Sequence, residues 1–348
     1  MPVLKLLYCT RHSDLLGRVR RPLLTISFAL TTLLLACVCP TNAQQAKKVP
    51  RIGYLSNNDP ATISVRVDPF RRGLRELGYV EGKNIFIEWR FAEGKPDRLS
   101  ALAAELARLK VDIIVTSGRI LTRAAKEATS TIPIVMTQDS DPVANGFVAS
   151  LARPGGNITG LSTLAPELSG KRVELLKEIV PNLSRVAVFG TSTTPGDAQI
   201  LREVELAARA FGVKTQYLDI LSPKDIETAF RAAVKGRAEA ILPIWAGVVS
   251  MPQRTKIAEL AVRNRLPTIF TSSPFVDAGG LMSYGANTAD LDRRAATYVD
   301  KILKGAKPAD LPVEQPKKFE FIINLKAAKQ ISLTIPASVL ARADRVIK

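Results

Sequence analysis

Residues 97–119 read DRLSALAAELARLKVDIIVTSGR and combine one amphipathic helical segment with one apolar strand segment. Leu99, Leu102, Ala103, Leu106 and Leu109 recur at helical spacing, and a β-branched run follows at 111–116. A short apolar run of this kind is typical of a parallel strand that is buried on both faces. The stretch therefore predicts one helix and one strand of a parallel α/β sheet.

The same alternation continues on both sides of this stretch. The predicted strands lie at 51–55, 85–89, 111–116 and 132–136, and, after a helix at 167–180, at 185–190, 214–220, 239–244 and 266–270. This βαβ rhythm predicts mainly parallel sheets with helices on both faces. Because the rhythm restarts after a loop of Pro, Gly and Asn at 153–157, we expect two similar α/β halves.

The C-terminal part of the chain has a different order of elements. An apolar strand at 280–284 precedes a helix at 290–304. Three prolines between 308 and 316 predict an extended segment, because the residue before a proline disfavours the helical conformation. A last strand at 319–324 and a short helix after Pro336 complete the prediction.

Cysteine and histidine are confined to the first 39 residues. These residues hold all three cysteines and the single histidine, so the rest of the chain has neither a thiol nor an imidazole. Histidine is the usual general base near neutral pH, and both residue types dominate zinc and transition-metal sites. Neither a Gly-x-Ser-x-Gly nucleophile elbow nor a Walker phosphate loop is present. We therefore expect a binding protein without a metal, a cofactor or catalytic residues.

The N-terminal segment has the order of features of a secretory signal peptide. Basic residues are followed by an apolar run at 23–38 and by small and polar residues up to Ala43. The prediction is a signal peptide at 1–43 that is removed on export to the periplasm. An uncleaved membrane anchor is one alternative. Acylation of Cys37 is another, although the bulky Leu35 fits the lipoprotein pattern poorly.

The chain is strongly basic, with a formal charge of +17. Removal of residues 1–43 takes away five basic residues and one acidic residue and lowers the charge to +13. The remaining lysines and arginines are scattered along the chain, and no zinc module is present, so no nucleic-acid partner is expected. A solvated basic surface is the interpretation we adopt.

Several blocks of sequence resemble one family of transport proteins. They are 53–56 (GYLS), 77–85 (LGYVEGKNI), 141–143 (DPV), 149–160 (ASLARPGGNITG), 278–285 (AGGLMSYG) and the stretch 293–316. In their order and coverage, from about residue 50 to residue 348, they resemble the substrate-binding proteins of ABC transporters, in the branch that includes carriers of aromatic and other amino acids.

The resemblance implies a type I periplasmic-binding fold, in which two Rossmann-like lobes with parallel sheets are joined by three crossing segments. The crossings are expected near 157–162, 282–285 and 312–316. Lobe 1 would comprise 50–160 and 285–313, and lobe 2 would comprise 161–284 and 314–348. Hinge closure of the lobes around a solute would follow from this layout.

Candidate ligand-binding residues follow from the position of ligand sites in open α/β sheets, beyond the carboxyl ends of the strands. The candidates of lobe 1 are Ser56, Asn57, Ser117, Gly118, Arg119, Asp139 and Asp141. The candidates of lobe 2 are Thr191, Thr193, Trp245, Ser272 and Ser273.

Most of these candidates have a second interpretation. Ser117 and Gly118 precede a helix, where free amide groups would bind a carboxylate, but Ser117 would equally serve as an N-cap. Asp139 is a candidate partner for an ammonium group, whereas Asp141 precedes Pro142 and fits a capping role better. Arg119 would bind a second negative charge or lie on the surface, and Trp245 would stack on the solute or pack in the core.

The predicted function is that of an extracytoplasmic solute-binding protein of an ABC importer. It would close two lobes on a small polar organic solute, such as an amino acid or a related compound, and deliver it to the permease and ATPase subunits at the inner membrane. We expect a monomer. A ligand-sensing periplasmic protein that feeds a signalling partner is the alternative, and an exported hydrolase is a remote one.

Overall fold

The computed structural model describes residues 48–58, 64–193, 195–244 and 251–348. The predicted signal peptide at 1–43, Cys37 and Trp245 lie outside the described residues. Within the described part, no helix has both the length and the apolar character needed to cross a membrane.

The first sheet is wholly parallel and has the strand order β2-β1-β3-β4-β5. Its strands are β1 (Arg51–Ser56), β2 (Phe86–Phe91), β3 (Ile113–Thr116), β4 (Ile134–Asp139) and β5 (Ile158–Ser162). The helical segments associated with it are α2 (Ser64–Glu76), η1 (Pro96–Arg98), α3 (Leu99–Arg108) and α4 (Arg119–Ala128). Strands β1, β3, β4 and β5 are almost entirely buried, and for β1, β3 and β4 the apolar runs in the sequence predict this.

The second half contains a four-stranded sheet of order β12-β11-β10-β9, called the second sheet below, and a three-stranded sheet of order β7-β6-β8. A parallel bridge between Ile241 and Thr268 links the two sheets. The strands are β6 (Arg185–Gly190), β7 (Lys214–Asp219), β8 (Ala240–Pro243), β9 (Ile269–Phe270), β10 (Met282–Ala286), β11 (Phe319–Asn324) and β12 (Arg345–Ile347). The helices are α5 (Ser169–Ile179), α6 (Pro195–Ala210), α7 (Asp225–Lys235), α8 (Arg254–Arg263), α9 (Ser273–Asp277), α11 (Leu325–Gln330) and α12 (Ala337–Leu340).

Two differences from the predicted elements concern the C-terminal part. Strand β11 runs antiparallel to β10, because the chain comes back to the second sheet from the opposite direction. The segment predicted to be extended at 308–316 begins with a 3₁₀ turn, η2 (Pro308–Asp310). A proline at the first position of such a turn is tolerated because its missing N–H would have no helical partner there.

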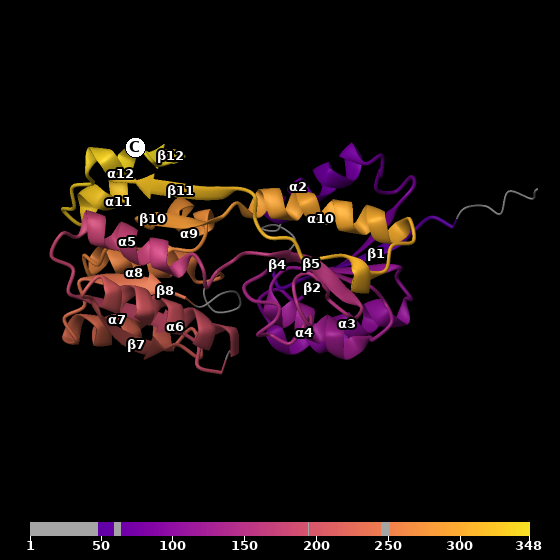
Figure 1. The fold of residues 1–348 in the computed structure, drawn as a ribbon, viewed down its shortest axis with the longest axis horizontal. Coiled ribbons are helices and arrows are strands. Elements are labelled where there is room, and N and C mark those ends of the chain that lie inside the picture. The colour runs from indigo at the N-terminus through magenta and orange to yellow at the C-terminus, as the bar shows by residue number, and fades with distance from the viewer. Residues whose placement is uncertain (1–47, 59–63, 194, 245–250) are drawn as a thin grey trace, which may run out of the picture. The chain divides into compact units, whose positions relative to one another are not determined.

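The chain passes repeatedly between the first sheet and the second sheet. Strand β5 belongs to the first sheet, and the chain then enters α5. Strand β10 belongs to the second sheet, yet the helix after it, α10 (Thr288–Leu303), packs along α2 and β4 (Figure 1). After α10, Glu314 forms a parallel bridge with Leu161 of β5 before the chain enters β11. These passages bring the carboxyl ends of strands from both sheets to one region.

Helices α2 and α10 approach each other closely at Gly73. A Cβ atom at this position would lie 2.2 Å from the carbonyl oxygen of Arg293. The contact therefore requires glycine, and it holds the late helix α10 against the first sheet.

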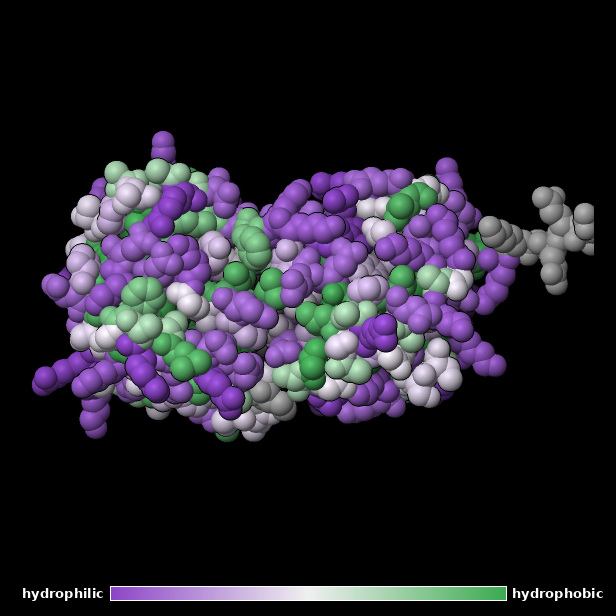
Figure 2. Space-filling view, viewed as in Figure 1, coloured by the Kyte–Doolittle hydropathy of each residue, from purple (hydrophilic) through white to green (hydrophobic). Residues whose placement is uncertain are grey.

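The surface is mainly hydrophilic on the face drawn in Figure 2, and apolar residues appear there in smaller groups. The exposed large apolar side chains include Leu206, Leu221, Val234 and Phe86. They come from different parts of the fold, and exposed apolar side chains that are scattered in this way are ordinary on a protein surface.

Candidate functional site

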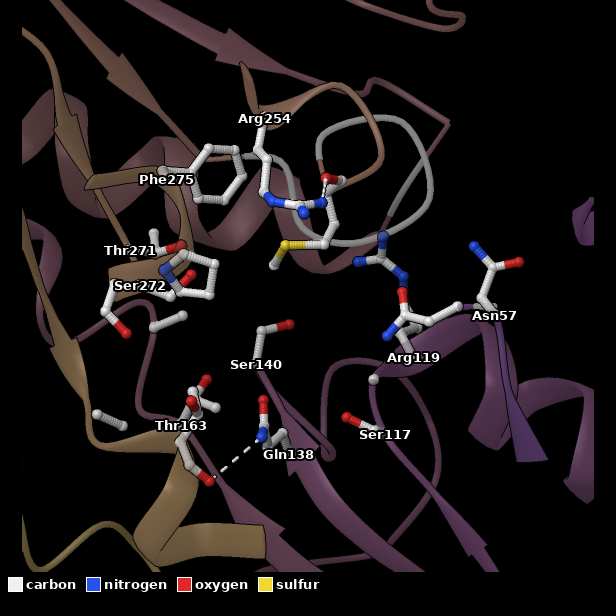
Figure 3. Close-up of a pocket in the computed structure, with 18 of the residues that line it drawn as sticks. Asn57, Ser117, Arg119, Gln138, Ser140, Thr163, Arg254, Thr271, Ser272 and Phe275 are labelled. Atoms are coloured by element: carbon white, nitrogen blue, oxygen red, sulfur yellow. Dashed lines mark hydrogen bonds between the residues drawn. The ribbon is translucent and has the colours of Figure 1, made fainter. Parts of the chain in front are cut away.

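A cavity of about 520 Å³ lies at the carboxyl ends of strands from both sheets. Residues after β1, β3 and β4 line one part of it, and residues after β9, together with α8 and α9, line another. In Figure 3, Gln138 lies in strand β4 of the first sheet, and Asn57, Ser117 and Arg119 follow strands of that sheet, whereas Arg254, Thr271, Ser272 and Phe275 come from the second half of the chain. The position agrees with the general location of ligand sites in open α/β sheets.

Seven sequence-predicted residues line this cavity. They are Ser56, Asn57, Ser117, Gly118, Arg119, Ser272 and Ser273. Asp139, Asp141, Thr191 and Thr193 are not among the lining residues. The ligand-binding roles of all these residues remain predictions.

The loop after β3 presents the N-terminus of α4 to the cavity. Gly118 is the N-cap residue, with a φ of 91°, and no side chain caps the helix. Ser117 therefore precedes the cap position. The amide N–H groups of the first turn of a helix carry partial positive charge, which makes this end suited to a carboxylate.

Arg119, the first residue of α4, forms an ion pair with Asp197 of α6. The Nη1–Oδ1 distance is 3.4 Å, and the exposed fractions of the two side chains are 12% and 4%. The pair joins a loop of the first sheet to a helix of the second half. Burial raises the pKa of Asp197 to about 6, although Arg119 and the Thr191 amide that donates to Asp197 act in the opposite direction.

Asp139 ends β4 and is 1% exposed. Its Oδ1 accepts hydrogen bonds from the backbone N–H of Asp141, at 3.0 Å, and from the side-chain amide of Asn145, at 2.8 Å. Burial raises the pKa of the Asp139 carboxyl to about 6. The carboxyl thus holds the loop that positions Ser140, which does line the cavity.

The remaining predicted residues make local contacts. Asp141 accepts a hydrogen bond from the backbone N–H of Ala144, at 3.0 Å, but the segment that follows it is a turn rather than the helix that a capping role implies. The Thr191 hydroxyl donates to the carbonyl of Ile220, and Thr193 is exposed.

Some polar groups of the cavity lining have a hydrogen-bond partner, and others have none among the described residues. Asn57 Oδ1 is buried and has no hydrogen-bond partner among the described residues. The Gln138 side chain donates to Asp292 of α10, at 3.0 Å. Because an unpaired buried oxygen is costly, Asn57 is a candidate acceptor for a donor group on a ligand.

Arg172 and Arg254 also line the cavity. The search for polar residues at the carboxyl ends of strands, called the strand-end rule below, misses both because they lie in helices α5 and α8. One signal for Arg172 exists in the sequence. It falls on the same helical face as Leu176 and Ile179, where a charged residue is unexpected. Phe275 adds an apolar surface, and its ring stacks on Phe270 at 4.7 Å between centroids.

Within the described part of the chain, no group of three His, Cys, Asp or Glu side chains is arranged to hold a metal ion. The lining offers hydroxyl, amide and guanidinium groups next to apolar side chains. Such an arrangement is suited to holding a small polar organic molecule by many directed contacts.

Residues 59–347 match the family of ABC transporter substrate binding proteins. The chain belongs to this family. Proteins of the family bind the solutes of ABC transporters and act outside the cytoplasm, so a small-molecule solute and membrane transport subunits are the implied partners.

Similar proteins support this assignment. The chain is 26% identical over 291 residues to a tyrosine-binding protein from Clostridioides difficile, with 83% of this chain and 82% of the relative covered. A conserved domain protein from Vibrio cholerae has a similar crystal structure, with a TM-score of 0.79, 28% identity, and coverage of 86% of this chain and 100% of that one.

A second solved structure contains a ligand. It is an ABC domain from Streptococcus pneumoniae in complex with L-Trp, with a TM-score of 0.79 and 25% identity, covering 86% of this chain and 99% of the other. These likenesses confirm the predicted family and the predicted α/β fold of the periplasmic-binding type.

Proposed function

We propose that this protein is the extracytoplasmic receptor of an ABC importer, and that it binds a small solute of the amino-acid type in the cavity between its two sheets. The observation that carries the proposal is the cavity itself, because strand ends of both sheets contribute to one polar and aromatic lining. Its volume of about 520 Å³ lies within the roughly 300–1,000 Å³ of small-molecule sites.

The ligands named for the relatives favour this solute class. One relative is a tyrosine-binding protein, and another was solved with L-Trp. In this chain, the N-terminus of α4 supplies amide groups for a carboxylate, Asn57 supplies a free acceptor, and Phe275 supplies an apolar face. The two lobes, divided at the crossings near residues 160, 285 and 314, close on the solute and then present it to the permease. No catalysis accompanies binding.

Thermal stability with added solutes tests the binding step. The protein is first unfolded and refolded to remove any bound solute, and L-tyrosine, L-tryptophan, other amino acids, organic acids, nucleosides and sugars are then added one at a time. A solute present at 100 times its Kd stabilises the folded state by about 2.7 kcal/mol. If no class raises the Tm of a demonstrably folded sample, the receptor function is refuted.

Asn57→Ala locates the site. We expect it to weaken solute binding while leaving the Tm of the ligand-free protein nearly unchanged. Asn182→Ala is the matched control, because Asn182 is exposed in the turn before β6 and lies outside the cavity lining. Equal affinities in the two variants would place the solute elsewhere.

Delivery to a permease is tested in cells. Deletion of the gene should abolish uptake of the identified solute, and expression of the full chain should restore it. Normal uptake, with loss of a transcriptional response to the solute, would favour a sensor instead. Mass spectrometry of the exported protein tests whether residues 1–43 are removed and whether Cys37 is acylated, and light scattering tests whether it is a monomer.

A further inference from the structure

Positively charged side chains outnumber negatively charged ones in the cavity lining. In the described part of the chain they are Arg119, Arg172, Arg254 and Asp277. Asp197 balances Arg119, and Arg345 balances Asp277 at an Nη2–Oδ1 distance of 2.7 Å. For Arg172 and Arg254, no carboxylate of the described residues lies within ion-pair distance. Two guanidinium charges at the cavity therefore have no compensating carboxylate among the described residues.

Arg172 is the more deeply buried of the two, at 2% exposure. Its Nε donates to the carbonyl of Tyr284, at 2.9 Å, and its Nη1 donates to the carbonyl of Ala165, at 3.2 Å. Both acceptors are neutral backbone groups, one in strand β10 and the other between β5 and α5. These bonds orient the guanidinium group without neutralising it.

Arg172 keeps its charge at neutral pH. Burial lowers its pKa to about 10, which is still well above 7. A buried cation normally has an anionic partner, because desolvation of an unpaired charge is costly. In the described part of this protein that partner is missing, so the cavity is suited to an anion that arrives with the solute.

Arg254 begins α8 and approaches the cavity from a different direction. Its Nη1 donates to the carbonyl of Met251, at 3.1 Å. Figure 3 shows its guanidinium group reaching toward the open space beside Phe275 and opposite Gln138 and Ser117. The planar group with its parallel N–H donors matches the geometry of a carboxylate.

We propose that the site selects a solute with net negative charge, of the acidic amino acid or the oxo- and hydroxy-carboxylate class, and that Arg172 and Arg254 supply the selectivity. The inference rests on the proposed function and names the chemistry of its solute. A zwitterion of zero net charge satisfies one cation with its carboxylate but brings an ammonium group into a lining that already has excess positive charge. A dicarboxylate, or a carboxylate without an ammonium group, avoids this repulsion.

Isothermal titration calorimetry with matched pairs of probes tests the selectivity. L-glutamate is compared with L-glutamine, and phenylpyruvate with L-phenylalanine, because the members of each pair differ mainly in charge. We expect the anionic member of the preferred pair to bind at least tenfold more tightly, and its affinity to fall as the salt concentration rises from 50 to 500 mM. Equal or tighter binding of the neutral member overturns the inference and leaves the proposed function standing. Absence of binding by every probe also overturns the inference, and the wider screen of solute classes then decides whether the proposed function stands.

Arg254→Gln assigns the selectivity to a residue. It should reduce the affinity for the anionic probe at least tenfold and change the affinity for the neutral member much less. Arg263→Gln is the matched control. It removes the same charge from the same helix, but Arg263 is exposed at the other end of α8. Arg172→Gln should act in the same way, and if it does not fold, Arg254→Gln decides alone. Unchanged selectivity in Arg254→Gln refutes the proposal.

Discussion

Asp139 shows how a residue chosen from its place in the sequence can have a different environment in the folded protein. The strand-end rule brings it to the right edge of the sheet, yet its carboxyl is turned into the loop and bonded to Asn145 and to the Asp141 amide. Burial dominates its electrostatics and raises its pKa to about 6. Its charge is therefore a cost to the fold at neutral pH.

Asp139→Asn should remove this cost. Between about pH 4 and pH 6 the folded state binds more protons at Asp139 than the unfolded chain does, so the wild-type contribution to stability falls as the pH rises through this window. A shift of about two pKa units corresponds to about 3 kcal/mol. Relative to wild type, the variant should therefore gain up to about 3 kcal/mol in the free energy of unfolding between pH 4 and pH 7.

Urea unfolding of both proteins from pH 4 to pH 8 measures this difference. The amide keeps an oxygen to accept the bonds from Asn145 and from the Asp141 amide, so the loop should remain intact. A difference that is independent of pH would contradict the raised pKa.

For single residues, the sequence predicts where a side chain lies in the fold better than it predicts which groups surround that side chain. Ser56, Asn57, Ser117 and Ser272 follow strands, and the sheet order places them at the cavity. The environment of Asp139 depends on Asn145, which no local pattern links to it. Arg172 is signalled only by its place on the apolar face of its helix, and that place does not show which groups surround the side chain.

At the element scale, local periodicity is sufficient where strands are buried. Strands β6 and β11 have the predicted bounds, and helix α10 lies within two residues of its prediction. Strand β12 has partly exposed residues and only three positions, so it carries no apolar signal. The antiparallel direction of β11 is set by the path of the chain between the sheets, which periodicity does not contain.

The contact between α2 and α10 gives a sharp test at this scale. Gly73→Ala places a methyl group against the Arg293 carbonyl, where only 2.2 Å is available. We expect a loss of about 2 kcal/mol in the free energy of unfolding, in the range of overpacked sites. Chemical denaturation measures it.

Gly170→Ala is the matched control in a second helix. Its nearest neighbour would be the Ala207 Cβ atom at 3.9 Å, which is an ordinary contact. It should raise stability by roughly 0.5–1 kcal/mol because alanine loses less conformational entropy in a helix. Equal effects of the two substitutions would show that α2 and α10 are not tightly packed at Gly73.

For the whole molecule, the sequence alone gives two α/β halves, and the resemblance adds the crossings and the cleft. What neither provides is the set of contacts that hold the two halves around the cavity. The ion pair of Arg119 with Asp197 is such a contact, because α4 follows strand β3 of the first sheet and α6 follows strand β6 of the three-stranded sheet. It depends on tertiary geometry between positions 78 residues apart.

Asp197→Asn tests whether this pair favours the solute-bound arrangement. Asp197 does not line the cavity, and the amide oxygen of the variant can still accept the bond from the Thr191 N–H. At pH 7.5 the variant should bind the solute about tenfold more weakly, which corresponds to about 1.4 kcal/mol, and should show a smaller decrease in radius of gyration when the solute is added.

The pKa of Asp197 makes the test specific. Because burial raises this pKa to about 6, the wild-type carboxyl is largely protonated at pH 5 and no longer carries the charge that attracts Arg119. The affinities of wild type and Asp197→Asn should therefore converge at pH 5. Asp68→Asn, an exposed substitution on α2, should match wild type at both pH values. A deficit of Asp197→Asn that persists at pH 5 would assign its effect to packing rather than to the ion pair, and the pair would then have no part in holding the two lobes together.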